Sequence, residues 1–134
     1  ADKLLFMNKL QEANFTLDTI LNFFPNHTLD DDIYYLKGKI YAKSQDWEKS
    51  ITYYTKVFTD YGDDILADDA YYQAAITYQE KLGMDFEAFK LLEKLVLNYQ
   101  GSVFAVGARE RYRILREDNP DFVNRSSQEP AENP

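Results

Sequence analysis

Carboxylates and phenols at close spacing are the groups in this sequence that could do chemistry. The stretch DDAYYQAAITY, residues 68–78, places two aspartates just ahead of two tyrosines, and a related stretch, DDIYYLKGKIY, occupies residues 31–41. Clustered carboxylates can hold a hard cation, and two carboxylates in unlike, desolvated surroundings can act as general acid and base. Metal binding and acid–base catalysis are therefore the first functions to weigh against the sequence.

The other groups that such chemistry needs are missing. The chain has no cysteine, and its one histidine, His27, cannot form a zinc or acid–base constellation by itself. Neither the spacing nor the glycine turn of a calcium-binding loop is present. The acids fall in expected joints and first helical turns, where they cap helices and favour solubility. We therefore expect no catalytic residues, no metal site and no cofactor. The acids concerned are Asp30, Asp31, Asp32, Asp63, Asp64, Asp68 and Asp69.

The charge balance narrows the partners. The chain of 134 residues carries 23 acidic and 15 basic residues, a formal net charge of −8. Such a surface repels a phosphate backbone unless its basic groups gather on one face. The basic cluster at residues 109–116 has glutamates within and beside it, so nucleic acid is not an expected partner. No apolar run reaches the roughly 18–20 residues that a membrane span requires, so we expect no membrane insertion of this chain.

The elements that position these side chains are expected to be helices. Apolar residues recur at helical intervals through residues 33–41, 47–61 and 86–99, and no segment shows sustained alternation. Pro25 is followed by no other proline before Pro120, which leaves room for long helices. The sequence therefore predicts an all-α protein.

The helices are expected to recur in pairs. The two stretches that open this section match at a spacing of 37 residues, and the joint aromatics Phe24, Tyr61 and Tyr99 are spaced by 37 and 38. We expect the extra residue of the later repeat in the turn between its two helices. Repeats of this length are typical of a solenoid, in which each helix pair buries its apolar face on the next.

The repeat resembles the tetratricopeptide repeat (TPR) family. Small residues stand where two helices must cross closely, and large ones stand where the surrounding space is filled. The elongated period resembles that of TPR proteins of the bacterial cell envelope, and residues 65–83 and 101–118 resemble the C-terminal part of large TPR proteins from Bacteroidetes. This resemblance implies a right-handed superhelix of about six helices and favours the periplasm or cell envelope. The matching positions are Tyr34, Gly38, Tyr41, Ser50 and Tyr54, then Tyr71, Ala75, Tyr78, Ala88 and Leu92.

The repeat frame divides the chain. A TPR-like helical domain is expected over residues 1–118, followed by a polar, flexible tail over residues 119–134. The frame places residues 8–24 as the second helix of an incomplete first repeat, whose first helix is cut to a stub at residues 2–7. The expected parts of the domain are a partial repeat at about 1–30, repeats at 31–67 and 68–105, and a capping helix at 102–117.

The resemblance also selects candidate partner-binding residues. In the family, certain positions of each first helix point into a concave groove, and here they hold tyrosine, lysine, isoleucine and glutamine. An alternative is that Tyr72 only packs on the neighbouring helix. The implied function is a non-enzymatic scaffold that binds a protein or peptide. The runner-up is a spacer or self-association module that uses the truncated N-terminal face. The candidates, called the predicted strip below, are Tyr35, Lys39, Tyr72, Ile76 and Gln79.

Overall fold

The structure is all-helical in the part of the chain that it describes. The computed structural model describes residues 2–23, 30–60 and 65–129, and within them it contains seven α-helices, one π-helix and no strand. The predicted all-α class is confirmed, with seven α-helices where about six were expected. The elements are α1 (Asp2–Phe23), α2 (Asp30–Lys43), α3 (Trp47–Asp60), α4 (Ala67–Ile76), the π-helix η1 (Thr77–Lys81), α5 (Asp85–Asn98), α6 (Ala105–Asp118) and α7 (Phe122–Gln128).

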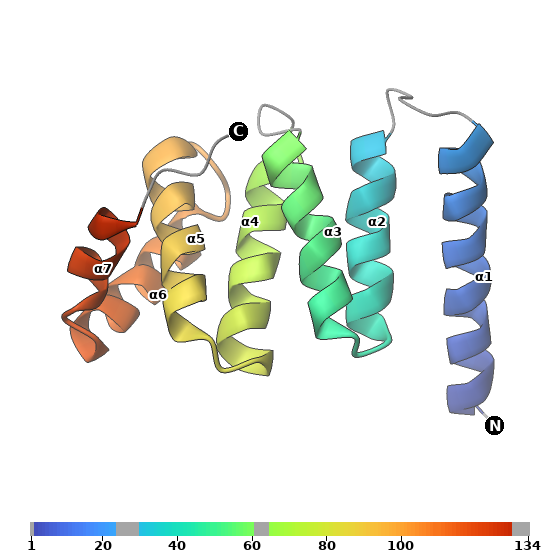
Figure 1. Ribbon diagram of the computed structural model, residues 1–134, viewed down its shortest axis with the longest axis horizontal. Helices are drawn as coiled ribbons and strands as arrows, with labels where there is room; N and C mark the ends of the chain where they lie inside the picture. The colour runs from blue at the N-terminus through green and yellow to red at the C-terminus, as the bar shows by residue number, and fades with distance from the viewer. Residues whose placement is uncertain (1, 24–29, 61–64, 130–134) are drawn as a thin grey trace.

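The helices form a row. From α1 to α6 each helix packs on the next one in the chain, and α7 folds back against α5 (Figure 1). Such nearest-neighbour packing is what defines a solenoid, so the predicted architecture is confirmed.

Small residues set the spacing between the helices. A Cβ atom on Gly38 of α2 would lie 2.8 Å from two ring carbons of Tyr54 on α3. The Ser50 hydroxyl, also on α3, donates a hydrogen bond of 2.7 Å to the Gly38 carbonyl oxygen. Ala75 and Ala88 are fully buried at the matching places of the next pair. The short side chains predicted at these crossings therefore allow the close approach that the repeat requires.

The extra residue of the second pair lies in a helix, not in the turn where we expected it. The Asp46 N–H reaches the Tyr41 carbonyl at 2.9 Å, whereas the Met84 N–H reaches the Tyr78 carbonyl, one residue further back, at 2.8 Å. In the second pair the helix ends in η1, and a π-helical turn is how a helix accommodates one inserted residue. Both turns then end alike, with a positive φ at Gln45 and at Gly83.

Helix α1 is one continuous element and not a stub followed by a second helix. No glycine or proline separates residues 2–7 from residues 8–23, so nothing ends the helix there. Helix α1 buries Leu10, and its contact with α2 also includes a polar network. The buried Lys37 ammonium of α2 donates to Asp18 at 2.6 Å and also to Asn14, while Asn14 donates to the Tyr41 hydroxyl at 3.0 Å.

Part of the expected flexible tail is also helical. Residues 122–128 form α7, and the buried Phe122 ring packs on Phe86 and Phe89 of α5 at centroid distances of 5.2 and 5.4 Å. The sequence PDF at the start of α7 repeats the MDF that begins α5, so the same Asp-Phe pair opens both helices. The polar composition of the segment hid this one apolar anchor. The domain boundary at residue 118 stays a prediction.

Candidate protein-binding surface

The two tyrosines of the predicted strip tie successive first helices together. Tyr35 of α2 donates its hydroxyl hydrogen to the Asp69 carboxylate of α4. One repeat later, the Tyr72 ring of α4 lies 5.3 Å from the Phe104 ring beside α6. A Cβ atom on Gly107 of α6 would come within 2.5 Å of the Tyr72 hydroxyl oxygen. Each tyrosine is half-buried where its helix meets the first helix of the next repeat, so the packing role that we weighed for Tyr72 is present in the structure.

The other three residues of the strip lie beside these contacts between first helices. Lys39 is exposed, and its ammonium sits 5.5 Å from the centroid of the Tyr35 ring. Ile76 is half-buried at the end of α4. The Gln79 side-chain oxygen accepts a hydrogen bond of 2.8 Å from Arg111 of α6. The structure therefore distributes the strip over α2, α4 and η1, with its far end fixed by α6.

Arg111 is a member of this surface that sequence reasoning missed. Its guanidinium bonds Gln79 and also pairs with Glu80 at 3.0 Å, so it bridges η1 to α6. Burial lowers the pKa of Arg111, but hydrogen bonds with Glu80 and Tyr72 outweigh burial, and the net pKa is raised. The sequence signal for this contact was Gly107, one helical turn before Arg111. Because Gly107 has no side chain, Tyr72 can pack against it, and α4 and α6 come close enough for the Arg111 bridge.

The phenols of this region are held in the protonated form. Burial, followed by the hydrogen bond to Asp69, raises the pKa of Tyr35 well above 10.0. Burial and the Asp69 charge likewise raise the pKa of Tyr54 to about 12. At neutral pH these groups therefore serve as hydrogen-bond donors and cannot act as bases or metal-binding phenolates.

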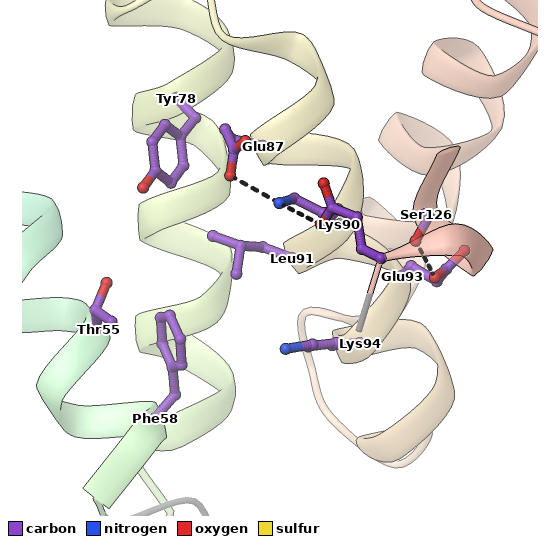
Figure 2. A pocket seen from close by; sticks show the side chains of 10 residues that line it. Thr55, Phe58, Tyr78, Glu87, Lys90, Leu91, Glu93, Lys94 and Ser126 are labelled. Atoms are coloured by element: carbon purple, nitrogen blue, oxygen red, sulfur yellow. Dashed lines mark hydrogen bonds and ion pairs between the residues drawn. The ribbon is translucent and has the colours of Figure 1, made fainter. Parts of the chain in front are cut away.

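A small cavity on another side of the stack has charged walls that are already paired. It has a volume of about 230 Å³ and lies between α3, α5 and α7 (Figure 2). Lys90 pairs with Glu87 at 3.1 Å and with Glu129 at 2.9 Å, while Glu93 accepts a hydrogen bond of 2.9 Å from Ser126. Because α7 supplies one wall and was expected to be a flexible tail, the sequence did not reveal this cavity. Its apolar lining is Phe58, Tyr78 and Leu91.

Metal ligands and membrane-spanning helices are two further features to consider in residues 2–23, 30–60 and 65–129. Across these ranges no three histidine, cysteine, aspartate or glutamate side chains gather as metal ligands would. No helix in the same ranges combines the length and apolar character that crossing a membrane demands. His27, Asp63 and Asp64 of the sequence analysis lie outside the described residues.

The fold defines a class, the helix-pair solenoids, in which each pair of helices packs on the next. The family model described as tetratricopeptide repeat matches residues 32–64 and 69–102, two successive repeats that cover half of the chain. The chain belongs to the tetratricopeptide repeat family, whose members generally mediate protein–protein interaction and are typically non-enzymatic. No curated protein matches the chain.

Proposed function

We propose that this chain is a non-enzymatic scaffold that binds an extended or helical segment of a partner protein along the predicted strip. The observation that supports the proposal best is the pre-ordering of the strip by contacts within the chain. Tyr35 is fixed by Asp69, and Gln79 is fixed by Arg111. Side chains that are already ordered lose little conformational entropy when a partner binds.

The surface also has a suitable mixture of chemistry. Tyrosine offers a large apolar area and a hydroxyl group, and Ile76 adds aliphatic surface beside it. Lys39 is exposed and forms no ion pair with another described residue, so its charge can meet a carboxylate of the partner. A partner segment with apolar side chains and at least one acidic residue fits this combination. The chain's net charge of −8 favours a protein partner over nucleic acid.

Site-specific photo-crosslinking tests the proposal. A photoreactive residue replaces Ile76 in the full chain, and a matched chain carries it at Thr52, which is exposed on α3. We expect the probe at residue 76 to capture a defined protein in cells and the probe at residue 52 not to capture it. The identified partner should then bind Lys39→Glu more weakly than the unmodified chain. Equal capture from both positions, or unchanged affinity of Lys39→Glu, would contradict the proposal.

A second candidate function, self-association or stacking within a longer protein, is favoured by α1. In the repeat frame the place of a second helix falls within α1, and five large apolar side chains on α1 are between 45% and 75% exposed. Sedimentation at several concentrations tests this function. A concentration-dependent dimer that Phe15→Ser abolishes would support it, and a strict monomer would count against self-association. The exposed side chains are Leu4, Leu5, Phe6, Phe15 and Phe23.

The elongated repeat adds a location to the proposal, the bacterial cell envelope. Its support is the resemblance of the repeat period and of residues 65–83 and 101–118 to envelope TPR proteins. Fractionation of cells that express the parent protein tests the location, with periplasmic or membrane-associated recovery as the expected result. Recovery with the cytoplasmic marker would contradict it.

A further inference from the structure

A second surface, next to the predicted strip but formed by other residues, exposes apolar side chains at equivalent places in two repeats. Ile65 precedes α4 and is 85% exposed, and Val103 precedes α6 and is 86% exposed. Each stands immediately before a half-buried anchor, Leu66 or Phe104. Isolated apolar residues on a surface are ordinary, but a pair repeated at one position of a repeat and facing a common cleft is a candidate contact site.

A cleft of about 840 Å³ connects the two residues. It lies at the edge of the stack where α5 ends and where α4 and α6 begin. Ile65 and Val103 belong to its lining, together with Leu66, Tyr99 and Phe104. We call this feature the joint cleft. It is open and partly apolar, which suits a segment of another protein better than an enclosed small molecule.

The exposure of Val103 is built into the structure. The Ser102 hydroxyl donates to the Asp68 carboxylate and accepts a hydrogen bond of 3.1 Å from the Phe104 N–H. These two bonds fix the backbone on either side of Val103 against α4, while the Phe104 ring packs on Tyr72. The Val103 side chain is thus held outward on an ordered backbone.

The cleft is negatively charged. Asp68 and Asp69 are in its wall, and no lysine or arginine is among the described residues that line it. The groups that hydrogen-bond to these two carboxylates are neutral: Ser102 and a backbone N–H for Asp68, and Tyr35 and Gln73 for Asp69. The positive end of the α4 dipole, equivalent to about half a charge, offsets only part of the two negative charges.

We propose that the joint cleft binds a basic, apolar segment of a partner protein, one in which an aliphatic side chain is flanked by lysine or arginine. The aliphatic group would pack between Ile65 and Val103, and the cation would meet Asp68 and Asp69. The charge is opposite to that expected of a segment on the strip, where Lys39 favours an acidic group. The two surfaces therefore select different segments, so a negative binding result for one surface does not count against the other.

Methyl and amide NMR of the full chain tests this inference with a defined probe. The probe is a short synthetic peptide of leucine and lysine. Two matched peptides carry glutamate in place of lysine or serine in place of leucine. We expect the first peptide to shift the signals of Ile65, Gly101 and Val103, and the other two to shift them little. Added salt should weaken the binding, because the attraction is partly between exposed charges.

Variants of the cleft sharpen the test. Ile65→Ser combined with Val103→Ser should weaken peptide binding about tenfold or more, since contact with two aliphatic side chains is lost. Asp68→Asn keeps an acceptor for Ser102 while removing the charge, and should also weaken binding. Ile114→Ser, at a 41% exposed side chain of α6 that does not line the cleft, is the matched control and should leave binding unchanged.

Other outcomes would overturn the inference. The glutamate peptide could bind as well as the lysine peptide, or the shifts could map to Lys39 and Ile76 instead of the cleft. The chain alone could form a dimer that Ile65→Ser dissolves, in which case a second copy is the occupant. Circular dichroism melts of each variant must show an intact fold, which is expected because Ile65 and Val103 are exposed.

Discussion

Lys37 is the most deeply buried charge in the described part of the chain, at 1% exposure, and it holds α1 to α2. Besides its bonds to Asn14 and Asp18, its ammonium lies 5.0 Å from the centroid of the Tyr53 ring. In the next repeat the equivalent residue is Ala74, which suits close packing alone. A lysine at this place therefore gives the α1–α2 contact two polar bonds that an alanine could not form.

Removing Lys37 should loosen α1. Lys37→Ala leaves the Asn14 amide without its donor and opens a void, so we expect unfolding to become easier by about 3 kcal/mol. Lys37→Met refills much of the volume and should be less damaging. Urea unfolding measures both, and hydrogen exchange should show the loss first in residues 2–23. Asp18→Asn keeps an acceptor for the ammonium at a side chain that is 51% exposed, so it should cost less than Lys37→Ala.

The effect of Gly107→Ala on stability is expected to change sign when Tyr72 is replaced by phenylalanine. A Cβ atom on Gly107 would lie 2.5 Å from the Tyr72 hydroxyl oxygen and 3.2 Å from the ring carbon that bears it. We expect Gly107→Ala to destabilise the chain by about 1–3 kcal/mol through overpacking. In a Tyr72→Phe background the oxygen is gone, and the same change should become neutral or stabilising, because alanine favours a helix over glycine by about 1 kcal/mol. A double-mutant cycle by thermal unfolding without this coupling would refute the contact.

Among the elements, α7 buries one side chain, Phe122. Phe122 is buried on Phe86 and Phe89, and the Arg125 guanidinium lies 3.8 Å from the centroid of the Phe86 ring. Phe122→Ala should release α7 and cost about 1–3 kcal/mol, less than a central core site because a terminal helix can unfold separately. Hydrogen exchange should rise in residues 122–128. Val123→Ala, at a 39% exposed neighbour, should change little.

The repeat period predicted the helix pairs, because apolar spacing and small residues at crossings report directly on packing. What it missed depends on single residues. The extra residue of the second repeat is accommodated in η1. The backbone N–H of Asp46 bonds the carbonyl five residues earlier, at Tyr41, whereas that of Met84 bonds the carbonyl six residues earlier, at Tyr78, and no sequence signal announces the change. One phenylalanine, Phe122, turned a polar tail into a helix. Arg111 joined the strip only because the course of α6 brings it to Gln79.

At the scale of the whole molecule, phenols that are buried or half-buried occur along the stack, and they make its stability fall at alkaline pH. Burial is the largest cause of the raised pKa at each of them, and neighbouring carboxylates or phenols add to it. Every helix of the row depends on its neighbours, so ionising phenols in three different helices weakens the entire array. The residues are Tyr34 and Tyr35 on α2, Tyr53 and Tyr54 on α3, and Tyr112 on α6.

The direction of the effect follows from linkage. Each folded-state pKa is raised above the ordinary 10.0, so the contribution is fully present below pH 10 and is lost as pH rises through the folded values, which for Tyr54 means to about 12. We expect the free energy of unfolding from urea titrations to fall over this interval. Tyr54→Phe removes one titrating group and should flatten the fall, as should Tyr35→Phe. Tyrosinate absorbance should appear together with loss of helical circular dichroism. A chain that titrates its tyrosines near pH 10 while still folded would show that these phenols are not buried as the structure has them.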